Sequence, residues 1–183
     1  IDELLQAARS ADPPLLYGSG GVGSQGHLLM EDLAARLGLR LNHVPYRGNS
    51  PAAAGLVRGE VRRLMAGVSS LGLVRAGRLR VIAVATPRRS PMFPDVPALS
   101  EVLPGFYGTA WFGLFGRAGT PADALAEMLQ FTETAVASAE MRAALLQRGN
   151  VAASFSSGAA FRTLIDDERR RFAAIAARLP AGQ

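Results

Sequence analysis

The chain has 183 residues, about half of them apolar, a formal net charge of +5, no cysteine and no lysine. This length and apolar content suit one to one and a half globular domains, and no apolar run is long enough to cross a bilayer, so direct membrane insertion is not expected. The lack of cysteine excludes disulfides and thiolate metal sites. With two histidines the sequence predicts no metal, and arginines scattered without interleaved aromatic residues argue against nucleic-acid binding.

Short apolar runs alternate with segments of helical spacing in the first half of the chain. Ser50 suits the N-cap of one such helix, and Gly38 and Gly59 suit helix ends. The expected elements, in chain order, are a helix over 2–9, a strand over 15–17, a helix over 25–37, a strand over 41–44, a helix from Pro51 to about Arg58, a strand over 61–66, a helix over 69–76 and a strand over 79–85.

The second half begins with an irregular, proline-rich stretch over 87–104. The elements expected after it are a strand over 106–115 with Trp111 at its centre, helices over 121–137 and 139–148, a strand over 151–153 and a helix over 157–179. Strands alternating with helices predict βαβ units and a mostly parallel sheet. Ligands in such sheets bind beyond the carboxyl ends of the strands, where the segments 18–24, 45–50 and 66–69 are expected.

A glycine-rich segment, Gly18-Ser19-Gly20-Gly21-Val22-Gly23-Ser24, joins the first strand to the helix after it. Glycines let the backbone turn sharply and approach a ligand closely. The start of a helix offers unpaired N–H groups and a partial positive charge. The segment therefore predicts a site for a carboxylate or a phosphate.

Other interpretations of this segment remain open. Gly18, Gly20 and Gly23 match the G-x-G-x-x-G fingerprint of dinucleotide-binding folds, and the nearby Arg47 suits a 2′-phosphate, so an NADP-binding oxidoreductase domain is the alternative function. The acidic residue that this fingerprint requires after the second strand is missing. The segment also suits a tight turn that binds nothing. No catalytic constellation is present, so we expect no enzyme.

Several runs resemble the substrate-binding proteins of tripartite tricarboxylate transporters, the Bug or TctC family. They appear in the family's order: Leu16-Tyr-Gly-Ser-Gly-Gly-Val-Gly-Ser24 with His27, His43-Val-Pro-Tyr-Arg-Gly48, Ala76-Gly-Arg-Leu-Arg80, Asp95-Val-Pro97 with Glu101, and Trp111-Phe-Gly-Leu114 with Gly119-Thr-Pro121. Together they cover most of the chain.

The resemblance implies an α/β fold of the type II periplasmic-binding-protein kind, a three-layer domain with a mostly parallel sheet plus the C-terminal part of a second α/β lobe. Residues 1–110 would form the complete second lobe, and residues 111–183 the C-terminal portion of the first lobe, whose N-terminal part is absent. The implied function is a periplasmic receptor that captures a small carboxylate-containing metabolite for the membrane subunits of such a transporter, without a cofactor. A truncated paralogue that binds nothing is a further alternative.

Carried over by position, the resemblance also implies ligand-binding residues. Those expected to contact one carboxylate through N–H and hydroxyl groups are Ser19, Gly20, Gly23 and Ser24, and those expected in the next loop at the site are Tyr46, Arg47 and Gly48. His27 and His43 are expected to be packed structural residues. Arg62 stands where the family tends to have aspartate, so the pocket or the packing of that strand is expected to differ from that of typical members.

Overall fold

The computed structural model describes residues 2–108, 110–147 and 156–179. It divides into two compact units, one formed by Ile1–Gly108 with Arg169–Gln183 and the other by Thr109–Glu168. The division into lobes at residues 110 and 111 that the family resemblance implies stays a prediction.

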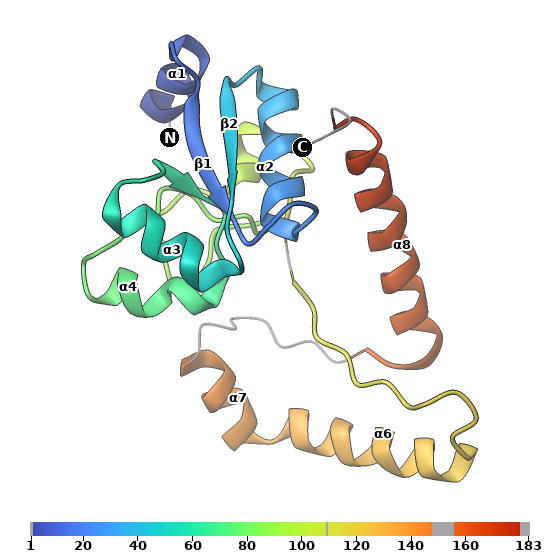
Figure 1. The fold of residues 1–183 in the computed structure, drawn as a ribbon. Helices are drawn as coiled ribbons and strands as arrows, with labels where there is room; N and C mark the ends of the chain where they lie inside the picture. The colour runs from blue at the N-terminus through green and yellow to red at the C-terminus, as the bar shows by residue number, and fades with distance from the viewer. Residues whose placement is uncertain (1, 109, 148–155, 180–183) are drawn as a thin grey trace. The chain divides into compact units, whose positions relative to one another are not determined.

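The first unit is built on a parallel sheet, as the sequence predicted. Strand β1 (Leu15–Ser19) lies at the centre, between β2 (Leu41–Pro45) and β3 (Arg63–Leu64), in the order β2-β1-β3 (Figure 1). Tyr17 is in register with His43 on one side and Arg63 on the other. Side chains in register on neighbouring strands share a face of the sheet. Tyr17, whose hydroxyl donates to Glu31 of helix α2, shows that this face is the one α2 covers.

Caps set the bounds of the helices around the sheet. Helix α2 (Gln25–Leu37) begins after Ser24 and ends at Gly38, which is left-handed with φ of 64°. Helix α3 (Asn49–Arg58) begins after Gly48, two residues before the start expected from Ser50, because Gly48 rather than Ser50 makes the turn into the helix. The other helical segments of this unit are α1 (Asp2–Ser10), the 3₁₀ turn η1 (Val68–Ser70), α4 (Leu71–Arg75) and α5 (Leu99–Val102).

The core of the first unit lies between α2 and the sheet. Its buried members come from separate parts of the chain: Tyr17, Leu29, Met30, Leu33, Leu99 and Phe106. Phe172, from the end of α8 (Gly158–Ala176), packs against them. Gly108 lies so close to Leu29 that a Cβ at position 108 would be 2.5 Å from Leu29 Cδ1.

Three of the strands expected from the sequence are shortened or do not form in the described residues. The strand expected over 61–66 has two residues, and the one expected over 79–85 is reduced to a single parallel bridge between Val84 and Ala98. The strand expected over 106–115 does not form in the described residues. Apolar sequence indicates a buried or extended backbone, but a strand also needs a neighbouring backbone to pair with. The strand expected over 151–153 lies outside the described residues.

The second unit is helical. It contains α6 (Ala122–Ala137), α7 (Ala139–Gln147) and the first turns of α8. Phe161 of α8 meets the rings of Trp111 and Phe115, with centroid distances of 5.4 and 5.8 Å. Helix α6 has no buried residue. Within the described residues, no helix is both long enough and apolar enough to span a membrane.

Candidate ligand-binding loop

The glycine-rich segment forms a loop, Gly20–Ser24, between the carboxyl end of β1 and the start of α2. The loop after β2 lies directly beside it. The N–H of Tyr46 donates to the carbonyl of Ser19 at 3.0 Å, and the N–H of Gly48 donates to that of Gly20 at 3.1 Å. The sequence predicted that both loops lie at the carboxyl ends of the strands, and in the structure they lie side by side at this end of the sheet.

A tight turn gives the loop its shape. The N–H of Ser24 donates to the carbonyl of Gly21 at 3.1 Å, with Val22 and Gly23 at the centre. Gly23 has φ of 74°, whereas no non-glycine residue in the described chain has positive φ. A positive φ at the third residue but not at the second is the pattern of a type II turn, which favours glycine at its third position. The positive φ at this position thus explains why residue 23 is a glycine.

The two serines of the segment use their hydroxyls inside the protein. Ser19 is fully buried; its Oγ donates to the carbonyl of Gly21 and accepts from the N–H of the same residue, at 3.0 and 3.1 Å. Ser24 caps α2, and its Oγ accepts the N–H of His27 at 3.4 Å. The ligand contacts expected of Ser19 and Ser24 stay a prediction, and in this structure both hydroxyls stabilise the loop itself.

Backbone donors remain at the surface of the loop. In the described part of the chain, the N–H groups of Gly20, Val22 and Gly26 have no hydrogen-bond partner. Val22 is 57% exposed. Unpaired N–H groups at the start of a helix, where the dipole is positive, attract anions. The loop therefore has the chemistry to receive a carboxylate.

The second loop contributes a cation and a packing residue. Arg47 is exposed beside the glycine loop. The ring of Tyr46 packs against Gly18 and Gly55, where added Cβ atoms would lie 3.3 and 2.6 Å from Tyr46 carbons. Its hydroxyl donates to Glu60 at 2.9 Å. Tyr46 therefore fixes the loop onto α3, and its expected ligand contact stays a prediction.

A buried polar cluster lies beneath the loop. His27 of α2 and His43 of β2 stack with ring centroids 4.0 Å apart, and His43 also stacks on Tyr17 at 5.0 Å. His43 Nε2 lies 2.6 Å from Ser19 Oγ, and His27 Nδ1 accepts the N–H of Gly23 at 3.1 Å. Both histidines were expected to be structural. The contact between Ser19 and His43 could not be predicted from the sequence, because the two residues are 24 positions apart.

Burial controls the ionisation of this cluster. It lowers the pKa of His43 from 6.5 to about 4, with a further contribution from His27. Burial also lowers the pKa of His27, although the carboxylate of Glu31 acts in the opposite direction. The Tyr17 hydroxyl has a raised pKa because it is buried and donates to Glu31. Both imidazoles are therefore neutral near pH 7.

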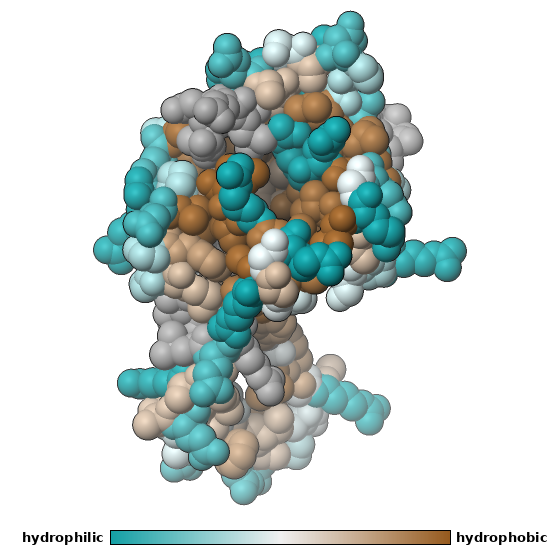
Figure 2. Space-filling model, turned by 90° about the vertical axis from the view of Figure 1, so that its left-hand side faces the viewer, coloured by the Kyte–Doolittle hydropathy of each residue, from teal (hydrophilic) through white to brown (hydrophobic). Residues whose placement is uncertain are grey.

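A second feature lies at the opposite end of the strands. An open hollow of about 520 Å³ is bordered by the end of α1, the start of β1 and the end of α3; its charged lining residues are Asp12, Glu60 and Arg62. Figure 2 shows one face of the molecule on which apolar residues gather in a hollow edged by hydrophilic ones.

Across the described residues, no group of acidic, histidine or cysteine side chains has the arrangement to hold a metal ion.

A parallel β2-β1-β3 sheet with unpaired backbone donors in the loop at its carboxyl end is the arrangement at which α/β domains commonly bind ligands. The family model of the tripartite tricarboxylate transporter family receptor, TctC, matches residues 1–180, and the chain belongs to this family. The family is one of solute-binding receptors, not of enzymes.

Relatives and solved structures agree with this assignment. A UPF0065 protein encoded in the tcbD-tcbE intergenic region of Pseudomonas sp. strain P51 is 38% identical over 152 residues, which are 81% of this chain and 45% of that protein. The malate-bound MatC protein of Rhodopseudomonas palustris is similar with 28% identity and a TM-score of 0.81, covering 96% of this chain and 61% of that chain. An adipate-bound protein of R. palustris, 28% identical, has a TM-score of 0.77 over 97% of this chain and 57% of its own. This chain thus spans less than half of the curated relative.

Proposed function

We propose that the protein is a periplasmic solute receptor that captures a small carboxylate-containing metabolite and delivers it to the membrane subunits of a tripartite tricarboxylate-type transporter. The family assignment supports this function, and two similar structures contain malate and adipate, both dicarboxylates. We expect no catalytic activity and no cofactor.

The observation that carries the proposal is the pair of unpaired donors in the glycine loop. The N–H groups of Gly20 and Val22 have no partner in the described chain and lie next to the positive end of α2. They would bind one ligand carboxylate, with Arg47 adjacent. Of the residues expected from the sequence, Gly20, Gly23, Arg47 and Gly48 shape or border this surface, while the ligand contacts of Ser19, Ser24 and Tyr46 remain proposals.

Replacing Val22 by proline tests this idea. Position 22 is the second residue of the type II turn, where proline is favoured, so Val22→Pro removes the N–H without disturbing the turn. Calorimetry with a panel of dicarboxylates, including malate and adipate, amino acids and aromatic acids should show one-to-one binding by the unmodified protein. Val22→Pro should weaken it about tenfold or more, the value of one charge-assisted hydrogen bond.

Val22→Ala is the matched control, because it shortens the side chain and keeps the N–H. It should bind within about threefold of the unmodified protein. Circular dichroism should show that both variants fold. Equal affinities of the proline and alanine variants would exclude the Val22 N–H from the site. If the correctly folded protein bound no compound of the panel, this result would contradict the receptor function.

A further inference from the structure

Two histidines lie beneath the ligand loop and contact it through hydrogen bonds. His27 is fully buried, and its ring stacks on that of His43 with an angle of 21° between the planes. His27 accepts the N–H of Gly23 inside the loop, and His43 contacts the hydroxyl of Ser19, the last residue of β1 before the loop. These contacts determine where the protons of the two rings lie.

The hydrogen bonds of Ser19 assign a proton to His43 Nε2. The hydroxyl has one proton and two lone pairs. It donates to the carbonyl of Gly21 and accepts the N–H of Gly21, and His43 Nε2 lies 2.6 Å away. All three contacts are satisfied when His43 Nε2 carries a proton and donates it to the second lone pair.

The contact with Gly23 leaves His27 Nδ1 without a proton. An N–H group donates to this nitrogen at 3.1 Å, so the nitrogen is an acceptor. The proton of a neutral ring is then on Nε2, which is buried and has no hydrogen-bond partner in the described chain. Buried polar groups without a hydrogen-bond partner are uncommon in native proteins, so this one calls for an explanation.

We propose that His27 and His43 are positioning residues of the ligand loop, each acting as a neutral ring through one nitrogen. The inference rests on the proposed function, because it concerns the same loop. His27 fixes Gly23 at the centre of the turn, and His43 fixes Ser19, which accepts the N–H of Gly21. With the amides of Gly21, Gly23 and Ser24 bonded inside the loop, those of Gly20 and Val22 remain available to a ligand.

Protonation would break this arrangement. A proton on His27 Nδ1 would point at the N–H of Gly23, placing two donors in contact, and a charge on His43 would lie 4.0 Å from the His27 ring. The titratable and charged groups around the pair are Glu31 on α2, which favours a charged His27, Tyr17 on β1, and Arg63, which β3 places beside Tyr17.

The direction of the pH effect follows from burial. The pKa of both rings is lower in the folded protein than the ordinary 6.5, and that of His43 is about 4. The unfolded chain therefore takes up protons first as the pH falls, so the loop is stable near neutrality and loses stability between about pH 6.5 and pH 4. Ligand affinity should fall over the same interval.

Nitrogen NMR of the histidine-labelled protein tests the proton positions without any ligand. At pH 7 both rings should be neutral, with the proton on Nε2, and the Gly23 amide resonance should shift as His27 titrates below pH 6.5. A charged ring at pH 7, or a proton on His27 Nδ1, would overturn the inference.

Paired variants test the positioning role. His27→Asn keeps an acceptor near Nδ1, whereas His27→Phe keeps a ring without one; likewise His43→Gln keeps the donor that His43→Phe lacks. Affinity for malate and adipate should fall about tenfold or more in the phenylalanine variants, as expected for one lost hydrogen bond at the loop. The asparagine and glutamine variants should restore most of it and show a flatter pH profile between pH 7 and 4.5. Equal losses in both members of each pair would contradict the role.

The result is separable from that of the receptor hypothesis. Protection of the Gly23 amide from hydrogen exchange should disappear in His27→Phe and persist in His27→Asn, whether or not any acid binds. This exchange pattern in a protein that binds no acid contradicts the receptor function alone. Ligand binding that is unaffected by all four substitutions contradicts the positioning role alone.

Discussion

Gly26, the second residue of α2, packs closely against the backbone that follows β3. A Cβ added there would lie 2.8 Å from the carbonyl oxygen of Met65, a backbone atom that cannot rotate away. This approach brings the segment after β3 to the start of α2, beside the ligand loop. The φ of Gly26 is not in the left-handed region, so its backbone conformation does not require glycine. The close contact with Met65 does, because it leaves no room for a Cβ.

Gly26→Ala should therefore destabilise the protein. Alanine in place of glycine within a helix normally stabilises by about 0.5–1 kcal/mol, but the contact with Met65 should reverse the sign and cost about 1–3 kcal/mol. Gly72→Ala in α4 is the control, since nothing lies within 4 Å of the added Cβ and the usual gain is expected. Urea unfolding of both variants compares the two free energies, and a gain in both would show that the backbone at Met65 moves freely.

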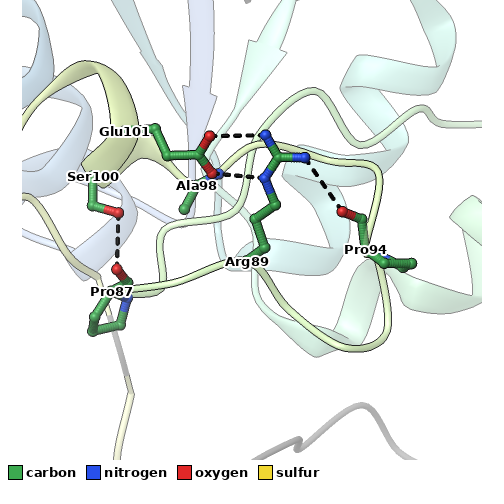
Figure 3. A network of polar contacts seen from close by, with 6 residues as sticks. All are labelled: Pro87, Arg89, Pro94, Ala98, Ser100 and Glu101. Atoms are coloured by element: carbon green, nitrogen blue, oxygen red, sulfur yellow. Dashed lines mark hydrogen bonds and ion pairs between the residues drawn. The ribbon is translucent and has the colours of Figure 1, made fainter.

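At the scale of elements, a single carboxylate holds the proline-rich segment against α5 (Figure 3). Glu101 accepts from Arg89 Nε and Nη2, each at 2.8 Å, and from the N–H of Ala98 at 2.9 Å. Ser100 Oγ donates to the carbonyl of Pro87 at 3.0 Å. The bonds from Arg89 and Ala98 lower the pKa of Glu101 to about 2, with Arg89 the largest cause. They explain how a helix of four residues, too short to be stable alone, persists.

Glu101→Gln should lower the melting temperature by a few degrees at pH 7. Because the pKa of Glu101 is depressed from 4.5, its contribution is present above that value and is lost as the pH falls through about 2. The difference in melting temperature from the unmodified protein should therefore shrink towards pH 2, and also in high salt. The control is Glu127→Gln on α6, whose carboxylate has no ion pair among the described residues. A pH-independent difference would show that the pair does not form in solution.

At the scale of the whole molecule, the two units differ in how they bury their aromatic residues. Phe106 is 1% exposed in the core of the first unit, whereas Phe112, six residues later, is 88% exposed in the second. Phe115 and Phe131 are likewise exposed. The apolar run over 106–115, expected as a strand, therefore begins in a packed core at Phe106. Its later residues, such as Phe112, are exposed, and none of its described residues is paired in a sheet.

Alanine substitutions should separate these environments. Phe106→Ala should cost about 3–5 kcal/mol of unfolding free energy, because it leaves a cavity, whereas Phe112→Ala should change it by no more than about 0.5 kcal/mol. Binding of the dye ANS reports exposed apolar surface and should decrease in Phe112→Ala. A large loss of stability in that variant would show that the ring is buried in solution.

The sequence by itself determined the features whose signals are local. Caps and apolar spacing within a few residues placed α2, α6 and α7 within a residue or two of their observed bounds. The glycine-rich segment identified the loop, and five short runs in the family's order identified the family. Parallel pairing followed from the alternation of strands and helices.

Only the tertiary structure decided which strands find partners and which polar groups remain free. A strand exists when another backbone lies beside it, so the apolar runs over 79–85 and 106–115 were insufficient evidence. The hydroxyl of Ser19 turns inward because His43 and Gly21 offer it better-placed partners than solvent does. Contacts between residues far apart in the chain depend on the folded backbone, since the local sequence does not specify which groups the fold brings within hydrogen-bonding distance.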